Sequence, residues 1–353
     1  WSFSMAISQK VTGFMENSSW IRKMFEEGIR LKQEFGEENV FDLSLGNPVM
    51  EPPEEVRKAL VESARDESPG LHRYMPNAGF ADVRAVIAES LSAECKVELS
   101  ANDVVMVCGA AGGLNITLKT LLDPGDEVII FTPYFVEYLF YADNHGGKAV
   151  PVPTGDDFRL DFTALKNALN EKTKAVIINS PNNPTGVVYS RQELQELALI
   201  LKAHSDKLGK AVYLISDDPY KKITFDGVEA PNIMEFYQNS IYITSHSKDI
   251  ALPGERIGFV AVHPQCESAG PLMAGLIFCN RVLGFVNAPA LIQRAVKKVQ
   301  GVTVDVDQYC RKRDYLYNEL TRIGYKVVKP QGAFYFFPKS PLEDEVAFVK
   351  KLA

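Results

Sequence analysis

The sequence lacks the features that identify membrane-spanning, secreted and nucleic-acid-binding proteins. None of its apolar runs approaches the ~20 residues that a membrane-spanning helix needs, and it contains no apolar segment of the secretory type. It has no block of basic residues: 38 Lys and Arg stand against 45 Asp and Glu, a net charge of -7. A nucleic-acid-binding role therefore has no electrostatic support. We expect a cytoplasmic protein with neither membrane nor nucleic-acid partners.

Cysteine pairs are also missing. The five cysteines show no C-x-x-C spacing, so we expect them to be reduced and structural, and we predict no metal site. Internal repeats and low-complexity linkers are absent. The chain has 353 residues, 46% of them hydrophobic, which is enough for one large core and a smaller one. The cysteines are Cys95, Cys108, Cys266, Cys279 and Cys310.

A single lysine, Lys248, stands in a turn between two apolar runs. The runs, Ile241 to Thr244 and Arg256 to Val262, are separated by about eleven residues that include a proline and a glycine. This connection is too short for the helical crossover of a parallel pair, so we predict two antiparallel strands. A lone lysine in a polar turn is usually a surface residue, and that interpretation stays open on these residues alone. Three neighbours suit an anion, namely Ser245, Ser247 and Arg256.

Apolar, β-branched runs alternate with segments of helical period along most of the chain. At least seven of these runs are predicted strands, which indicates an α/β fold with a mostly parallel sheet. Ligands of such sheets bind at the carboxyl ends of the strands. The predicted strands span residues 103–107, 127–132, 148–152, 175–179, 211–216, 241–244 and 256–262, with short ones at 41–45 and 332–337. The predicted helices span 16–35, 52–64, 114–122, 161–170, 191–207 and 307–320.

Polar and small residues follow several of these strands. Asp217 ends an apolar strand, where a carboxylate is costly unless it meets a cation; the alternative is a helix N-cap. Two prolines and a glycine force a sharp loop around Asn183. The small residues 108–113 directly precede a predicted helix, an arrangement that is typical of a phosphate-binding turn. This segment lacks the spacing of the dinucleotide and nucleotide loops, and a tight structural turn explains it equally well.

Taken together, these segments resemble the class I/II aminotransferases, pyridoxal-phosphate (PLP) enzymes of fold type I that are similar to aspartate aminotransferase. The resemblance implies a large α/β domain with a mostly parallel seven-stranded sheet that contains one antiparallel strand. It also implies a smaller α+β domain built from both ends of the chain. The shared motifs are S-H-S-K at 245–248 followed by Gly254, Arg256 and Gly258, N-P-T-G at 183–186, D-D-P-Y at 217–220, Y-x-P-x-x-G at 74–79 and P-x-G-A-F-Y at 330–335.

The resemblance also divides the chain. Residues 1–4 precede the first methionine and are expected to be a remnant of cloning. Residues 5–48 would form an N-terminal arm and part of the small domain, 49–289 the large PLP-binding domain, and 290–353 the rest of the small domain. In the family, the arginine that binds the substrate α-carboxylate lies beyond the position of Ala353, so we expect the sequence to be incomplete there.

Each matching residue is given a role by the resemblance. Lys248 would form the internal aldimine with PLP and act as the base in proton transfer. Asp217 would pair with the protonated ring nitrogen and keep the ring an electron sink. Tyr220 and Asn183 would bind the phenolic oxygen, and Phe135 would stack on the ring. The residues that would bind the phosphate are Gly109, Ala110, Ala111, Ser245, Ser247 and Arg256.

Other matching residues concern the substrate and a second subunit. Gly46 and Asn183 would contact the substrate. Tyr74, with Asn287 as a second candidate, would reach the phosphate of the partner's site, which implies a homodimer with two shared sites. Arg281 lies near the register of the arginine that binds a substrate side-chain carboxylate in aspartate-specific members; a solvated arginine is the alternative.

The implied activity is transamination by a ping-pong mechanism. An amino acid, aspartate being the first choice, would give its amino group to a 2-oxo acid such as 2-oxoglutarate. A PLP-dependent β- or γ-lyase is the alternative, because the residues that bind the cofactor are shared on this fold. A PLP-sensing regulatory domain is a third interpretation. It would be expected to carry a helix-turn-helix segment before the fold, and only about forty residues precede the predicted large domain.

Overall fold

The computed structural model describes residues 6–17, 19–41, 43 and 46–352, and the chain divides into two units, 1–47 and 48–353. The first unit contains helices α1 (Gln9–Asn17) and α2 (Ser19–Phe35) and the 3-10 helix η1 (Glu37–Asn39). The helix predicted over 16–35 corresponds to α2. A glycine with φ of 88°, Gly36, follows α2, as is common where a helix ends.

The short strand predicted at 41–45 is wrong where it can be compared. Phe41 and Leu43 are in no strand, and their side chains are 87% and 85% exposed. The two described apolar side chains of this segment are therefore largely uncovered, whereas a paired strand is favoured where its apolar side chains are buried. Its other three residues lie outside the described part of the chain.

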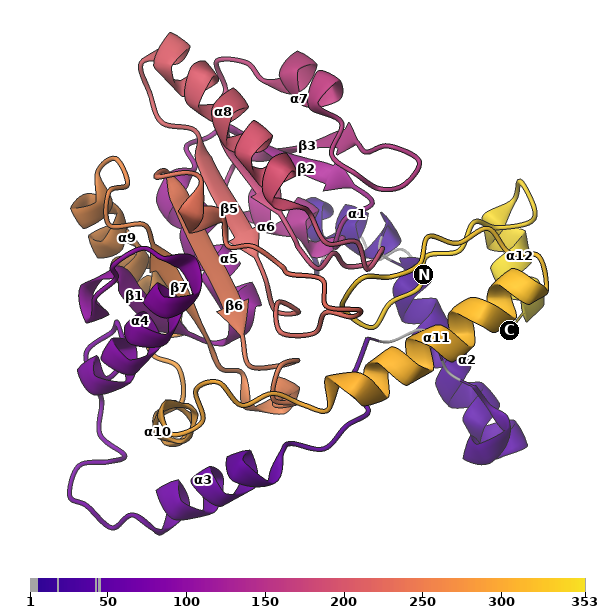
Figure 1. Ribbon diagram of the computed structural model, residues 1–353, viewed down its shortest axis with the longest axis horizontal. Coiled ribbons are helices and arrows are strands. Elements are labelled where there is room, and N and C mark those ends of the chain that lie inside the picture. The colour runs from indigo at the N-terminus through magenta and orange to yellow at the C-terminus, as the bar shows by residue number, and fades with distance from the viewer. Residues whose placement is uncertain (1–5, 18, 42, 44–45, 353) are drawn as a thin grey trace. The chain divides into compact units, whose positions relative to one another are not determined.

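The second unit is built on a seven-stranded sheet in the order β1-β7-β6-β5-β4-β2-β3 (Figure 1). Strand β7 runs antiparallel to both of its neighbours, and the other pairs are parallel. The predicted fold class, a mostly parallel sheet with one antiparallel strand, is therefore confirmed. The strands are β1 (Val104–Val107), β2 (Glu127–Thr132), β3 (Lys148–Pro153), β4 (Thr173–Ile178), β5 (Tyr213–Asp217), β6 (Ser240–Ser245) and β7 (Gly258–Val262).

Helices cover both faces of this sheet, because its central strands are apolar at successive residues that point to opposite faces. In β1, Val105 and Val107 pack with α5, α6 and α9, whereas Val104 and Met106 pack on the other face with α3, α4 and α10. Farther along that second face, α7 and α8 cover β2, β4 and β5. The helices are α3 (Glu54–Arg65), α4 (Ala81–Cys95), α5 (Gly109–Leu121), α6 (Glu137–Asn144), α7 (Phe162–Ala168), α8 (Arg191–Leu208), α9 (Ala269–Val282), α10 (Ala290–Lys297), α11 (Val306–Arg322) and α12 (Glu345–Leu352).

Two predictions in this unit, the start of one helix and the existence of one strand, are wrong. Helix α5 begins at Gly109 rather than at residue 114, so the small residues form its first turns instead of a preceding turn. The segment 332–337 forms no strand. Gly332 makes one isolated bridge with Thr224, and Ala333 then takes a φ of 58°, which interrupts the extended backbone that a strand ladder requires.

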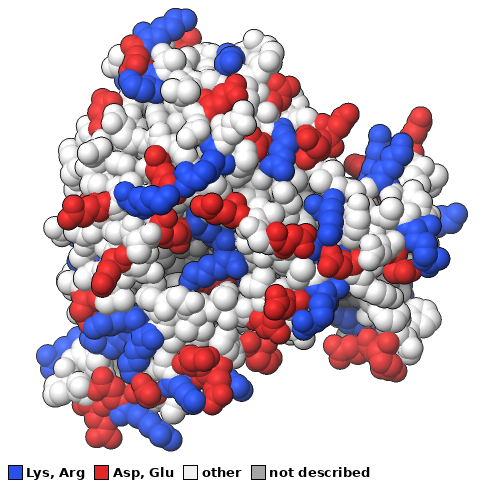
Figure 2. Space-filling model, in the orientation of Figure 1, with Lys and Arg blue, Asp and Glu red and all other residues white. Residues whose placement is uncertain are grey.

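The surface agrees with the composition. On the face drawn in Figure 2, acidic and basic side chains are interspersed and no large patch of one sign stands out. Among the described residues, no helix is long and apolar enough to cross a membrane.

Candidate functional site

The site lies at the edge of the sheet where its six parallel strands end. Strands β1 to β6 all point the same way, so their carboxyl ends share this edge. Strand β7 runs the opposite way and begins there: Gly258 pairs with both Val107 and Ser245. The segments that follow the strands, together with Arg256 just before β7, therefore meet at one edge, as α/β sheets place their ligand sites.

Asp217, the last residue of β5, is a buried carboxylate with one oxygen unsatisfied. Its Oδ2 accepts a hydrogen bond from Tyr138 Oη at 2.7 Å, and its backbone carbonyl accepts one from the Asn179 side chain. Its Oδ1 accepts none from any described residue. Burial raises the pKa of this carboxyl to about 7. Such a group is costly as an isolated anion and fits a bound cation that donates to Oδ1.

Lys248 is a partly buried amine in the turn after β6. Burial, with the positive charge of Arg256 as a second cause, lowers the pKa of Lys248 to about 8. Its Nζ lies 5.4 Å from the ring centre of Phe334 and 6.0 Å from that of Tyr220. A pKa of about 8 leaves about a tenth of the amine uncharged at pH 7, in the form that acts as a nucleophile or base.

Aromatic side chains from two segments surround this amine. Tyr220 Oη and Tyr335 Oη are 2.6 Å apart, and their rings meet edge to face with centres 5.5 Å apart. Burial raises the pKa of Tyr220 well above its usual range. The Phe334 ring also meets the Tyr220 ring, at 5.4 Å. Neither Phe334 nor Tyr335 is predicted as a site residue from the sequence, although the motif P-x-G-A-F-Y contains both.

A loop after β4 is tied to Asp217 through one asparagine. Asn179 donates to the Asp217 carbonyl, and its Oδ1 accepts the Asn183 backbone amide at 2.5 Å. Asn179 is not predicted as a site residue from the sequence, where its only signal is its place at the end of an apolar strand. Tyr138 is not predicted either; it stands three residues after Phe135, and the two rings meet edge to face at 5.6 Å.

The amino end of α5 and Arg256 form a positively polarised corner. The amides of the first turn of α5, including those of Ala110 and Ala111, have no earlier helical carbonyl to bond, and the helix dipole favours an anion there. A Cβ on Gly109 would lie 2.9 Å from Arg256 Nη2, so the guanidinium packs directly on this turn. Arg256 also donates to the Pro253 carbonyl at 2.8 Å. The buried hydroxyl residues Ser245 and Ser247 belong to the adjoining turn.

Replacing Gly109 with alanine is expected to weaken phosphate binding and folding together. Gly109 has φ of 73°, which costs a residue with a Cβ about 1–2 kcal/mol, and the new methyl would displace Arg256. Loss of a charge-assisted hydrogen bond corresponds to about a ten- to hundredfold rise in the Kd for a phosphate ligand. Denaturant unfolding and fluorescence titration with PLP measure both effects.

The matched control is Gly270→Ala in α9, where an added Cβ meets no heavy atom within 4 Å. This variant should keep its phosphate affinity and gain slightly in stability, because alanine is the better helix former. An unchanged PLP affinity in Gly109→Ala would exclude Arg256 and this turn from the phosphate site.

Four other predicted residues, Tyr74, Arg281, Asn287 and Gly46, come from segments other than those that directly follow the strands. Tyr74 is 94% exposed, and Arg281, on α9, lies exposed over the Phe278 ring at 5.4 Å. Asn287 donates to the Pro76 carbonyl at 2.9 Å, so it lies beside the loop that carries Tyr74. Gly46 belongs to the first unit. No group of three or more His, Cys, Asp or Glu suited to a metal ion occurs among the described residues.

Comparison with known proteins gives a consistent result. Residues 38–353 match the family described as aminotransferase class I and II. The chain is 33% identical to an aspartate aminotransferase of Pyrococcus abyssi, and the match covers 95% of this chain and 83% of that one. It is 32% identical to the aromatic-amino-acid aminotransferase 2 of Thermococcus litoralis over the same shares of the two chains, 95% and 83%.

Solved structures agree with the sequence matches. A crystal structure of an amino transferase from Eubacterium rectale has a TM-score of 0.94 with this chain at 39% identity, and the match covers 98% of this chain and 88% of that one.

Proposed function

The chain belongs to the class I and II aminotransferase family, whose members use pyridoxal phosphate, and from this premise we propose its substrates and the roles of its residues. The amino donor is aspartate and the acceptor is a 2-oxo acid such as 2-oxoglutarate, in a ping-pong reaction in the cytoplasm. The observation that carries this proposal is the buried, half-satisfied Asp217 at the same strand edge as Lys248, whose pKa is lowered.

The residues of this edge fit PLP by their chemistry. The unsatisfied Oδ1 of Asp217 would accept a hydrogen bond from the ring nitrogen, and the resulting ion pair would offset the burial of the carboxylate. The first turn of α5, Arg256 and the serines at 245 and 247 would hold the phosphate. Tyr220 and Asn183 would bind the phenolic oxygen, and Phe135 would cover the ring. When bound, PLP withdraws electrons from the substrate Cα and so makes its proton removable.

Lys248 would perform the proton transfer itself. Its uncharged Nζ removes the proton from the substrate Cα and later returns a proton as an ammonium ion. Burial lowers its pKa to about 8, so the amine can both accept and release a proton in one cycle. The aromatic rings of Tyr220 and Phe334 lie beside this amine and help to exclude water from it.

The choice of aspartate rests on the family resemblance and on the aspartate aminotransferase among the similar proteins. The relative that acts on aromatic amino acids is almost equally similar, so overall identity does not separate the two donors. Arg281 is our candidate for the substrate side-chain carboxylate. We also propose a homodimer in which the exposed Tyr74 reaches the partner's phosphate site, and a small domain formed by residues 5–48 and 290–353.

A half-reaction tests the reaction type. With PLP bound and aspartate as the only substrate, each site should release about one equivalent of oxaloacetate and then stop, because no acceptor regenerates the starting form. Addition of 2-oxoglutarate should restart turnover. Continuous product release without an acceptor would show a lyase instead. Repeating the assay with a panel of amino donors ranks them by kcat/KM, and aspartate is expected to rank first; a higher kcat/KM for aromatic donors would overturn the substrate assignment alone.

A further inference from the structure

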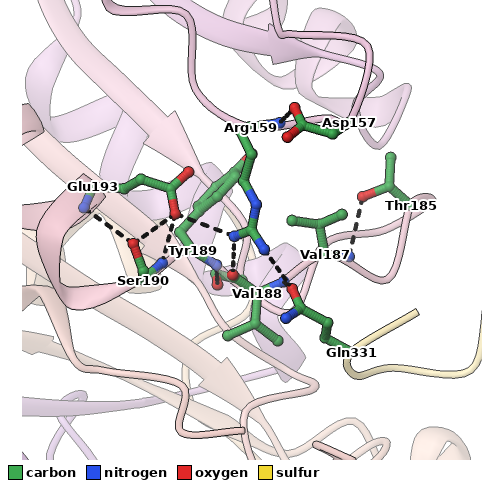
Figure 3. A network of polar contacts seen from close by, with 10 residues as sticks. Asp157, Arg159, Thr185, Val187, Val188, Tyr189, Ser190, Glu193 and Gln331 are labelled. Carbon is green, nitrogen blue, oxygen red and sulfur yellow. Dashed lines mark hydrogen bonds and ion pairs between the residues drawn. The ribbon is translucent and has the colours of Figure 1, made fainter. Parts of the chain in front are cut away.

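Arg159 joins three segments that lie far apart in the sequence (Figure 3). It stands in the connection between β3 and α7. Its Nη1 donates to the Val188 carbonyl at 2.5 Å and to Glu193 Oε2 at 3.1 Å, and its Nη2 donates to Gln331 Oε1 at 2.7 Å. Glu193 also accepts the backbone amide of Ser190 in the capping box that begins α8. The guanidinium therefore fixes the Gln331 side chain against the rigid start of a helix.

Gln331 is held from three sides. Its backbone amide donates to the Gly186 carbonyl at 2.8 Å, and its carbonyl accepts from the Phe225 amide at 2.8 Å. Its Oε1 accepts the Val188 amide at 3.3 Å as well as the bond from Arg159. Gly186 ends the N-P-T-G motif that begins at Asn183, so Gln331 is attached directly to the loop proposed to bind the cofactor.

The next residues are equally confined. A Cβ on Gly332 would lie 2.6 Å from the Ile223 carbonyl oxygen. The backbone at Gly332 therefore packs against the backbone of Ile223 too closely to leave room for a side chain. The Ala333 amide then donates to the Ile223 carbonyl at 2.9 Å. Phe334 and Tyr335 follow at once, the first beside Lys248 Nζ and the second in contact with Tyr220 Oη. The hydrogen bonds of Gln331 and the close backbone contact at Gly332 therefore fix the positions of the Phe334 and Tyr335 side chains.

The contacts of Arg159 are poorly placed to serve folding stability alone. Its side chain is 34% exposed, and a partly exposed ion pair contributes little to the free energy of unfolding. A small displacement of a group beside the reacting atoms, in contrast, changes rates strongly. Losing Arg159 should therefore change the catalytic rate more than it changes the free energy of unfolding.

We propose that Arg159 is a positioning residue that acts through Gln331 to hold Tyr335 against Tyr220. The proposal rests on the function proposed above, because it assumes that Tyr220 binds the cofactor. Without Arg159, the Gln331 side chain loses its charged donor and the Tyr335 hydroxyl no longer has one fixed position. Tyr220 then binds the phenolic oxygen of the cofactor with a different geometry.

A double-mutant cycle on the PLP-loaded enzyme tests this chain of contacts. Arg159→Met keeps the length of the side chain but removes its donors and charge, and Tyr335→Phe removes only the hydroxyl. Each variant is expected to lower kcat/KM by about tenfold, and the double variant by about the same factor, because the second change acts on a contact that the first has already disturbed. Both single variants should shift the pH titration of the absorbance of bound PLP in the same direction.

Arg191→Met is the matched control. Arg191 is the first residue of α8, is similarly exposed and pairs with Glu235 at 2.5 Å, and none of its hydrogen bonds goes to Gln331. It should leave kcat/KM and the titration within about twofold of wild type, and its effect should multiply with that of Tyr335→Phe. A lowered melting temperature in Arg159→Met with an unchanged titration, or independent effects in the double variant, would overturn the proposal. A wild-type protein that binds no PLP would instead overturn the proposed function.

Discussion

Replacing Lys248 with alanine is expected to lower kcat for transamination by at least about a thousandfold, because general acid–base catalysis alone contributes about 10²- to 10⁴-fold. The variant also loses the amine that would bind PLP covalently, so the visible absorption spectrum of the bound cofactor should change. Lys248 lies partly exposed in a turn outside the strands, so the fold should be retained. Steady-state kinetics, circular dichroism and the melting temperature measure these three outcomes.

Two comparisons make this result specific. Lys202→Ala removes an exposed lysine that pairs with Asp206 at 2.8 Å on α8, and it should leave kcat within about twofold of wild type because such pairs contribute little. Added methylamine should restore part of the activity of Lys248→Ala, since a free amine can supply the missing base. A Lys248→Ala protein that transaminates at the wild-type rate would remove Lys248 from the mechanism.

The sheet could be predicted from the sequence because its signals are local. Apolar β-branched runs mark the strands, and proline, glycine or a polar residue follows most of them. The antiparallel direction of β7 follows from the short connection after β6, and this prediction is confirmed. The strand ends then identify the edge where ligands bind, whereas the choice of Asp217, Asn183 and Lys248 within it came from motifs that resemble those of the aminotransferases.

The start of α5 could not be predicted in the same way, because glycine is a poor helix former and its cluster indicates a turn. The reason for the glycines is tertiary. A Cβ on Gly113 would lie 2.8 Å from Ile243 Cγ2 and 3.0 Å from Val260 Cγ2, so only glycine lets α5 approach β6 and β7 this closely. Local propensity is overridden here by the packing of the helix on the sheet.

Partners that are distant in sequence were missed for a related reason. Tyr138 and Asp217 are 79 residues apart, and Tyr220 and Tyr335 are 115 apart. The motif P-x-G-A-F-Y contains Tyr335 but does not indicate that Tyr220 is its partner, and no motif marks Tyr138. Contacts of this kind depend on how the completed sheet brings its connections together, which a single sequence does not encode in any short motif.

Replacing Asp217 with asparagine should have opposite effects on the cofactor-free and the PLP-loaded protein. In the cofactor-free fold, burial raises the pKa of Asp217 to about 7, above its value in the unfolded chain. A raised carboxyl pKa contributes stability that is complete below about pH 4 and is lost as the pH rises to about 7, on the order of 4 kcal/mol in all. Asparagine does not titrate, so the variant should gain in stability relative to wild type between pH 5 and pH 8, measured by denaturant unfolding.

With PLP present the order reverses, because the charged carboxylate gains a cationic partner that asparagine cannot provide. Breaking a buried ion pair costs about 3–5 kcal/mol, which corresponds to a loss of about 10²- to 10⁴-fold when the pair acts in the transition state. We therefore expect Asp217→Asn to bind PLP more weakly and to transaminate at least about a hundredfold more slowly.

Asp218→Asn is the control, because it also removes a buried carboxylate but one that is not proposed to contact the cofactor. Burial also raises the pKa of Asp218, to about 6, but its Oδ1 accepts a hydrogen bond from Ser216 Oγ at 2.8 Å. Its replacement should therefore change the pH dependence of stability in the same direction while leaving the PLP affinity within about threefold. If Asp217→Asn instead kept both its PLP affinity and its rate, the unsatisfied oxygen at the end of β5 would not be the partner of the cofactor nitrogen, and the electron-withdrawing role proposed for this edge of the sheet would be lost with it.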